Sequence, residues 1–202
     1  RLPFCISAII NLTVLIKKSI CSQEAREVNG MRTEFDAEKA IEEILYIAKR
    51  TSTPDLYSIV KIMYFADKKH LEKYGRFVCN DTYIAMKDGP VPSGAYDIIK
   101  HVRGDGYPCV DKHALSAFKV NPKPDYKIIP SRDANYDLLS ESDRECLDES
   151  IKEFGSLTFG ELKKLSHDKA YESADRNNEI PIEAIAATLK DGDLLIKYLT
   201  ES

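Results

Sequence analysis

Asp67 and His70 are the residues of this sequence whose types and spacing could perform acid–base chemistry. They stand three positions apart in a segment predicted to be helical, so their side chains can meet on one surface. A carboxylate that orients an imidazole is one way to build a general base. The sequence offers no nucleophile or metal motif beside them. It therefore favours a structural role for the pair, in which the acid holds the histidine or caps nearby backbone.

A second candidate is the segment Asp88–Pro92, which places a glycine ahead of a predicted helix, as phosphate-binding loops do. Pro90 and Pro92 lack backbone N–H groups, however, so the segment has few donors with which to hold an anion. We interpret it as a rigid turn in which Gly89 takes an unusual φ and Val91 presents an apolar tip. Such a turn suits a hinge or a preorganised contact surface.

The histidines and cysteines are too scattered to predict a metal site. The four histidines show no HxxxH or HxH spacing, and His167 stands at a predicted helix end, where its ring can bond the last carbonyls. The five cysteines contain no CxxC pair; they are Cys5, Cys21, Cys79, Cys109 and Cys146. An odd, widely spaced set of this kind indicates a reducing compartment. We expect no metal and no cofactor.

The elements that must position these residues are mostly helices. Apolar residues recur every three or four positions from Phe35 to Arg50, which predicts an amphipathic helix. A second helix is predicted from Pro54 to Tyr74, with Thr53 as its N-cap and Gly75 after its last turn. This second helix carries the acid–base pair described above.

Short strands and further helices follow along the chain. One or two strands are expected between Phe77 and Met86, and a hairpin joins Ala117–Val120 to Tyr126–Ile129. The further helices are predicted at Ser93–Val102 with Ser93 as the cap, Ser142–Phe154, Thr158–Ser166 with a capping box of Thr158 and Glu161, Ile182–Leu189 and Asp193–Leu199. The predicted fold class is mainly α with a small β element (α+β), as a single compact helical domain with a short strand or hairpin insertion.

Composition limits the classes of partner. The chain has 202 residues, of which 43% are hydrophobic, enough to build a core without disulfides or metals. Its net charge is −4, so it has no general positive field with which to attract nucleic-acid backbones or anionic lipid. We expect neither a nucleic acid nor a membrane as a partner.

Residues 1–30 differ from the rest of the sequence. An apolar stretch from Leu2 to Ile16 would span about 22 Å as a helix, short of the roughly 30 Å hydrocarbon core of a membrane. The first methionine is Met31, and the flanking charges are not those of a secretory signal. We expect residues 1–30 to be a leader or upstream-translated extension outside the fold, and 31–202 to form the domain. A packed element or a targeting segment is the alternative.

Tyrosine is abundant, with eleven residues, whereas tryptophan is absent. Six tyrosines crowd the first half of the sequence: Tyr46, Tyr57, Tyr64, Tyr74, Tyr83 and Tyr96. We expect about half of them to be core residues with hydroxyls bonded at the surface. The others could anchor a protein interface.

Three segments taken together resemble the Panacea domain, the SocA-like antitoxin domain that also occurs in phage-associated GepA proteins. They are Lys61–Arg76 (KIMYFADKKHLEKYGR), Asp81–Ser93 (DTYIAMKDGPVPS) and Leu165–Tyr171 (LSHDKAY). The resemblance covers about Phe35 to Leu199. Phe77 stands where the family often has proline, and Tyr171 where tryptophan is common, so both departures keep an apolar or aromatic character.

The resemblance implies a cytoplasmic antitoxin of bacterial or phage origin that binds and neutralises a protein toxin encoded beside it. Some members of the family instead act as adaptors that present the toxin to a protease. The residues that would form or support the contact surface are Tyr64, Asp67, His70, Tyr74, Tyr83, Gly89, Pro90, Val91, Pro92 and His167.

Two other classes of function remain as alternatives. A hydrolase or transferase would use Asp67 and His70, with His167 brought near them in the fold. A transcriptional regulator would need a basic recognition helix, which the sequence does not show. The prediction is therefore a binding protein, with no catalytic residues.

Overall fold

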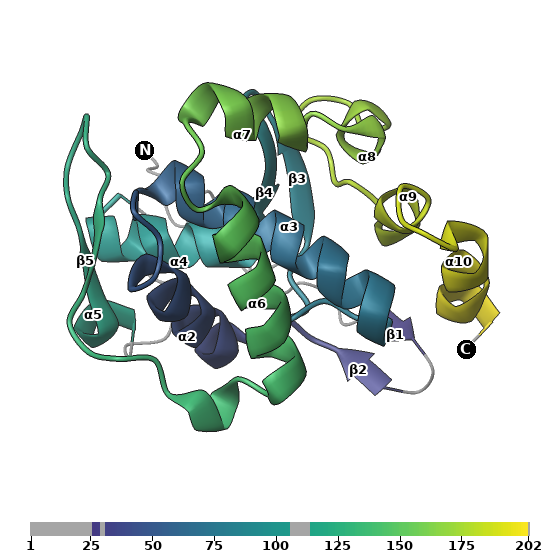
Figure 1. Ribbon diagram of the computed structural model, residues 1–202, viewed down its shortest axis with the longest axis horizontal. Coiled ribbons are helices and arrows are strands. Elements are labelled where there is room, and N and C mark those ends of the chain that lie inside the picture. Colours follow the sequence, from purple (N-terminus) through teal and green to yellow (C-terminus); the bar gives the residue numbers. More distant parts are fainter. Residues whose placement is uncertain (1–25, 29–30, 106–113, 202) are drawn as a thin grey trace, which may run out of the picture. The chain divides into compact units, whose positions relative to one another are not determined.

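The computed structural model describes residues 26–28, 31–105 and 114–201 (Figure 1). An N-terminal unit ends at Glu34 and contains an antiparallel pair, β1 (Arg26–Val28) and β2 (Met31–Thr33). The second unit runs from Phe35 to Ser202. Most of the predicted extension, residues 1–30, lies outside the described residues.

The second unit is built mainly from helices, with two small antiparallel hairpins, β3–β4 and β5–β6. The predicted fold class, mainly α with a small β element, is confirmed. Its elements are α2 (Ala37–Ala48), α3 (Leu56–Tyr74), β3 (Tyr83–Met86), β4 (Gly89–Pro92), α4 (Ser93–Arg103), α5 (Ala114–Ala117), β5 (Phe118–Val120), β6 (Ile128–Pro130), the 3₁₀ turn η1 (Tyr136–Leu138), α6 (Glu141–Phe154), α7 (Phe159–Ser166), α8 (Lys169–Glu172), α9 (Ile182–Ala186) and α10 (Gly192–Glu201).

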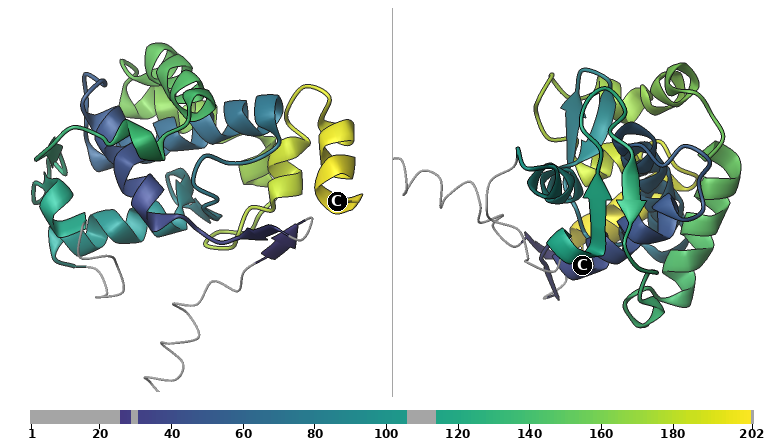
Figure 2. Two further views of the ribbon diagram at one scale, coloured as in Figure 1. Left: turned by 90° about the horizontal axis from the view of Figure 1, so that it is seen from below. Right: turned by 90° about the vertical axis from the view of Figure 1, so that its left-hand side faces the viewer.

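Helix α3 is the element on which the others pack. It contacts α6 along much of its length and also touches α2, α7 and β4 (Figures 1 and 2). Thirteen of its nineteen residues are buried, which explains why its sequence is apolar on more than one face. Its N-terminal half belongs to an apolar cluster with α2 and α4, and its C-terminal half joins a second cluster that includes α9.

The predicted start of α3 was wrong by two residues. The N-cap is Asp55, whose carboxylate accepts hydrogen bonds from the Ser58 N–H and hydroxyl at 3.0 and 2.8 Å. Thr53 does not cap the helix, because the chain is still extended at Asp55, with φ −87° and ψ 159°. The Pro54 carbonyl accepts a hydrogen bond from the Ile128 N–H at 2.7 Å. The predicted end is confirmed, with Gly75 at φ 72°.

Helix α4 is also capped in a way that the sequence analysis missed. Ser93 is the first helical residue and does not cap the helix. The carboxylate of Asp81 instead accepts hydrogen bonds from the N–H groups of Gly94 and Ala95, both at 2.8 Å. Asp81 thus caps a helix that begins twelve residues later in the chain, and its carboxyl group lies at the positive end of the helix dipole.

The segment Asp88–Pro92 is largely a strand, which corrects the predicted turn. The turn is Lys87–Asp88, and β4 pairs with β3 from Gly89 to Pro92. The other edge of β3 bonds to the segment 177–180, through Ala85 N–H to Asn178 O at 2.9 Å and Ile180 N–H to Tyr83 O at 2.8 Å. Strand β4 is therefore an edge strand, where prolines are tolerated.

Several local predictions are confirmed. Thr158 and Glu161 form the capping box at the start of α7, and β5 and β6 form the predicted hairpin. Of the five cysteines, Cys79 and Cys146 are described, and both are free and buried. Among the described residues, no helix combines the length and the apolar character needed to cross a membrane.

Two consecutive glutamates on α2 are buried in opposite electrostatic settings. Glu42 is held by Arg132, and although burial would raise its pKa, hydrogen bonds from Arg132 and from the Asn135 N–H lower it. The Glu43 carboxyl lies beside the Cys79 thiol, and burial and the nearby Asp67 raise its pKa well above the usual range. Glu43 is thus protonated in the folded chain at pH values where an unfolded chain has lost the proton.

This contrast predicts different pH dependences for two isosteric variants. A carboxyl with a raised folded-state pKa stabilises the fold below its unfolded pKa, and this contribution is lost as pH rises. The unfolding free energy of the unmodified chain should therefore fall as the pH rises from 5.5 to 8. In Glu43→Gln this fall should be smaller, by up to about 1.4 kcal/mol per pH unit. Denaturant unfolding at several pH values measures this slope.

Glu42→Gln is the matched control. Its contribution is present above the unfolded pKa and is lost only as pH falls, so the variant should be less stable by a similar amount across the same range. A Glu43→Gln slope equal to that of the unmodified chain would contradict the burial of an uncharged Glu43.

Candidate functional site

The three sequence segments that resemble the antitoxin family meet around the β3–β4 hairpin. Lys61, from α3, is fully buried, and its Nζ donates a hydrogen bond to the Pro90 carbonyl at 2.6 Å. Burial lowers the pKa of Lys61 to about 7, and Asp88 opposes this shift. The sequence alone does not mark Lys61 as a site residue, because a lysine on a helix is usually solvated and its partner lies 29 residues away.

Gly89 has no side chain, so the side chains of Lys61, Ser166 and His167 can approach the backbone of β4. It has φ 106°, which confirms the unusual φ expected for it. A Cβ at this position would lie 2.7 Å from Ser166 Oγ, 2.8 Å from Lys61 Nζ and 3.2 Å from a carbon of the His167 ring. The strand therefore requires glycine for two independent reasons, its backbone conformation and the lack of space.

Asp168 joins α3 to the start of α8. Its carboxylate accepts hydrogen bonds from the Tyr64 hydroxyl at 3.0 and 3.1 Å and forms an ion pair with Lys68 at 2.6 Å. It also caps α8 by accepting from the Tyr171 N–H at 3.0 Å. The Tyr171 hydroxyl in turn donates to the Met86 carbonyl of β3 at 2.9 Å. The Leu165–Tyr171 segment is thereby fixed to both α3 and the hairpin.

His167 ends α7 and packs against this region. Its ring stacks on Tyr171 with centroids 4.2 Å apart, and Nε2 is buried without a hydrogen-bond partner among the described residues. Burial and the positive charges of Lys163 and Lys61 lower its pKa. The lowered pKa favours the neutral ring, which packs against Gly89 and Tyr171.

Asp67 is a structural acid, as the sequence analysis favoured. Its carboxylate accepts from the Val78 N–H and from the Tyr83 hydroxyl, both at 2.7 Å. Burial raises the pKa of Asp67 to about 6, against the effect of these two hydrogen bonds. Asp67 thus caps backbone after α3 and anchors β3 to it, and its carboxylate is not bonded to His70.

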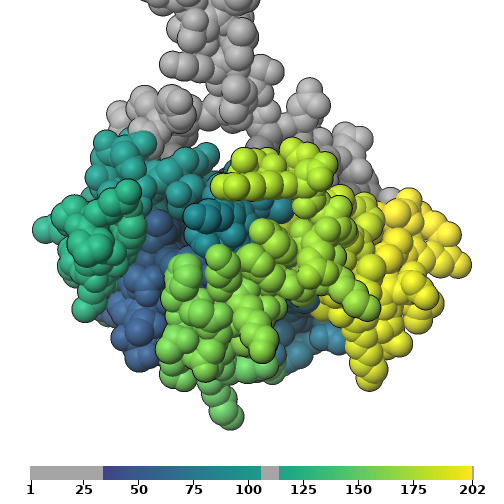
Figure 3. Space-filling view, turned by 90° about the horizontal axis from the view of Figure 1, so that it is seen from above, coloured from purple at the N-terminus to yellow at the C-terminus, as the bar shows by residue number. Residues whose placement is uncertain are grey.

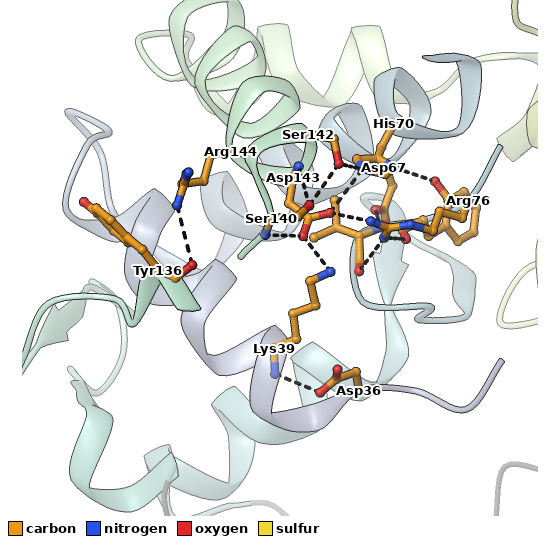
Figure 4. A network of polar contacts seen from close by, with 12 residues as sticks. Asp36, Lys39, Asp67, His70, Arg76, Tyr136, Ser140, Ser142, Asp143 and Arg144 are labelled. Carbon is orange, nitrogen blue, oxygen red and sulfur yellow. Dashed lines mark hydrogen bonds and ion pairs between the residues drawn. The ribbon is translucent and has the colours of Figure 1, made fainter. Parts of the chain in front are cut away.

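His70 has a different acid as its partner, Asp143 of α6. The ring Nε2 lies 3.1 Å from Asp143, and Nδ1 lies 2.9 Å from the Arg76 carbonyl. Lys39 and Arg76 approach the same carboxylate at 2.6 and 3.0 Å (Figure 4). Burial alone would raise the pKa of Asp143, but hydrogen bonds from His70, Lys39 and Ser140 hold it well below its usual range.

Most of the residues selected from the sequence are therefore buried side chains that pack beneath the hairpin or belong to it. Tyr74 is exposed (43%), whereas the other selected side chains and the four residues of β4 are buried or half-buried. Because Asp67 and His70 are buried and face different partners, they do not form an open acid–base pair. His167 packs against Gly89 and Tyr171 instead. Among the described residues, no group of three or more His, Cys, Asp or Glu side chains could hold a metal ion.

A groove of about 920 Å³ lies beside this buried region. Its floor is the start of α3, and its sides are the β3–β4 turn, Tyr96 of α4, the β5–β6 loop, the start of α7 and the segment at Arg176. In Figure 3 the blue start of α3 is recessed between green α7 and the teal-green β5–β6 hairpin. Val91, expected as an apolar tip, is only 8% exposed and lines this groove.

Gly89→Ala should strongly destabilise the chain. The left-handed φ and the contacts with Ser166 and Lys61 each oppose a methyl group, so we expect a loss of about 3 kcal/mol in unfolding free energy. Thermal and denaturant unfolding measure this loss.

Gly160→Ala on α7 is the matched control, since among the described residues nothing beyond its chain neighbours and its own helix backbone lies within 4 Å of an added Cβ. It should leave stability unchanged or raise it by about 0.5–1 kcal/mol through helix propensity. Equal stability of the two variants would show that Gly89 is not constrained.

Comparison with known protein families gives one match to this region. The model described as "Antitoxin SocA-like, Panacea domain" matches residues 59–172. Searches of curated proteins and of solved structures gave no match. The matched residues include Lys61, the β3–β4 hairpin and the Leu165–Tyr171 segment, and they span more than half of the chain. The chain therefore belongs to the antitoxin SocA-like, Panacea domain family.

Proposed function

We propose that this chain is the antitoxin of a toxin–antitoxin system and neutralises a protein toxin by binding it directly. Membership of the antitoxin SocA-like family is the observation that carries this proposal, because an antitoxin of this kind implies a protein toxin as its partner. The toxin would be encoded by the adjacent gene and act in the same cytoplasm. The free thiols of Cys79 and Cys146 are compatible with such a reducing compartment.

A binding role is supported by the contacts of the polar motif residues, which bond to the chain itself. Lys61, Asp67, Asp81 and Asp168 are bonded to other parts of the chain and hold the hairpin in one place. A surface that is ordered before binding loses less conformational entropy when a partner docks. The polar residues of the family motif thus support a rigid contact surface, and Asp67 and His70 offer no accessible acid–base pair for a hydrolase or transferase.

Co-expression tests this proposal. The full chain would be expressed in a bacterial host together with the product of the adjacent gene, with the partner alone as the control. We expect the partner to stop growth when expressed alone, the chain to restore growth, and the two proteins to co-purify in a defined ratio. Growth that is not restored, or a partner without toxicity, would contradict the proposed function.

The same experiment separates direct neutralisation from delivery to a protease. Under direct neutralisation the partner persists in the rescued cells, whereas under the adaptor mechanism it disappears. Repeating the rescue in a host that lacks its cytoplasmic proteases checks the distinction. Rescue that is lost in that host would favour the adaptor mechanism over direct binding.

A further inference from the structure

The groove beside β4 has an aromatic wall that is already in place. The rings of Tyr57 and Phe159 lie 4.1 Å apart, and Phe159 is 53% exposed. The Tyr57 hydroxyl donates to the Asp88 carbonyl at 2.9 Å, which fixes its ring against the β3–β4 turn. Tyr96 and Val91 continue the apolar lining. An inserted apolar side chain would thus meet a preformed surface.

Three cations that line the same groove form no ion pair with any described residue. Lys87 lies in the β3–β4 turn, Lys127 lies just before β6, and Arg176 lies in the segment between α8 and α9. All three are exposed, and within the described parts of the chain none of them forms an ion pair. On α3, by comparison, Lys68 and Lys73 are both paired with carboxylates.

The three acidic residues that line the groove each have a hydrogen-bond or ion-pair partner within the chain. Asp55 accepts hydrogen bonds at the start of α3, and Asp88 pairs with Lys163 at 2.7 Å. Asp125 accepts from Asn121 at 2.7 Å. Ser58 and Asn121 are neutral, so Asp55 and Asp125 keep their charge. Lys87, Lys127 and Arg176 still outnumber these two acids, which leaves the groove a small positive excess although the chain as a whole has a net charge of −4.

Lys61 adds a buried cation at the edge of the groove. Its side chain is fully buried and lines the groove, and its Nζ has the Pro90 carbonyl as a partner but no carboxylate within ion-pair distance among the described residues. Burial lowers its pKa to about 7. Negative charge brought into the groove would favour the ammonium form of Lys61.

We propose that this groove binds an acidic segment of the partner protein, with one apolar side chain of that segment against Tyr57 and Phe159 and its carboxylates at Lys87, Lys127 and Arg176. This inference rests on the proposed function for the identity of the partner. Charge complementarity and the preformed aromatic wall both favour this occupant. A short acidic segment needs carboxylates only at the three cations, whereas a continuous phosphate backbone would also have to pass Asp55 and Asp125, which line the same groove and keep their charge.

Binding measurements on two charge-matched variants test the proposal. The groove variant carries Lys87→Gln, Lys127→Gln and Arg176→Gln. The control variant carries Lys152→Gln, Lys164→Gln and Lys190→Gln, which remove the same charge from exposed positions outside the groove. Circular dichroism and thermal unfolding confirm that both variants fold, and isothermal titration then gives the Kd for the purified toxin at 50 and 300 mM NaCl.

We expect the groove variant to bind the toxin about tenfold more weakly than the control variant at low salt, and to show less dependence on salt. Phe159→Ala, which removes the exposed ring, should also weaken binding about tenfold without unfolding the chain. Equal affinities of the groove and control variants, or a Phe159→Ala variant that binds like the unmodified chain, would overturn the proposal.

A probe without the toxin distinguishes failure of the groove from failure of the proposed function. The probe is a fluorescein-labelled peptide with two Glu and two Asp residues around one Phe, compared with the same peptide carrying Lys at the acidic positions. Binding of the acidic peptide by the unmodified chain and its loss in the groove variant would support the groove even if the toxin does not bind. Equal binding of the two peptides, no binding of the acidic peptide, or tighter binding of a 20-nucleotide single-stranded DNA would overturn the proposal.

Discussion

The β3–β4 hairpin depends on polar side chains that come from other elements, because two four-residue strands have little stability of their own. Two residues of β4 are prolines and cannot donate to the strand ladder. Lys61 supplies a donor to the Pro90 carbonyl, Asp67 holds the Tyr83 hydroxyl, and the segment 177–180 pairs with the free edge of β3. The hairpin is therefore a small sheet held between α3 and the C-terminal part of the chain, and the shape of the groove depends on it.

These contacts carry an electrostatic cost that the packing must offset. Burial raises the pKa of Asp67 to about 6 and that of Asp81 to about 7, and it lowers the pKa of Lys61 to about 7. Buried charges of this kind cost stability unless hydrogen bonds satisfy them, but they also specify one arrangement of the chain. The family motif thus maps onto buried polar contacts, and the residues free to meet a partner lie beside it, around the groove.

Local signals in the sequence predicted much of the fold. The end of α3 at Gly75, the capping box of α7 and the β5–β6 hairpin each depend on residues a few positions apart. The misses share a physical cause, since their partners are distant in sequence: Asp81 caps α4 thirteen or fourteen residues away, and His70 meets Asp143 across more than seventy. Glycine and proline in β4 predicted a turn because these residue types favour turns. The segment is a strand because it makes contacts with α3 and β3, which the residue types alone do not indicate. The groove could not be predicted, because it is assembled from six separate segments.

Hydrogen–deuterium exchange of the full chain, free and bound to its co-expressed toxin, tests the central claim that a prefolded hairpin supports a binding surface beside it. The account predicts slow exchange at the Ala85 and Ile180 amides already in the free chain, because both are bonded within the small sheet. On binding, new protection should appear around Lys87 and Tyr126, at the rim of the groove. Fast exchange at Ala85 and Ile180 in the free chain, or new protection confined to segments away from the groove, would contradict the account.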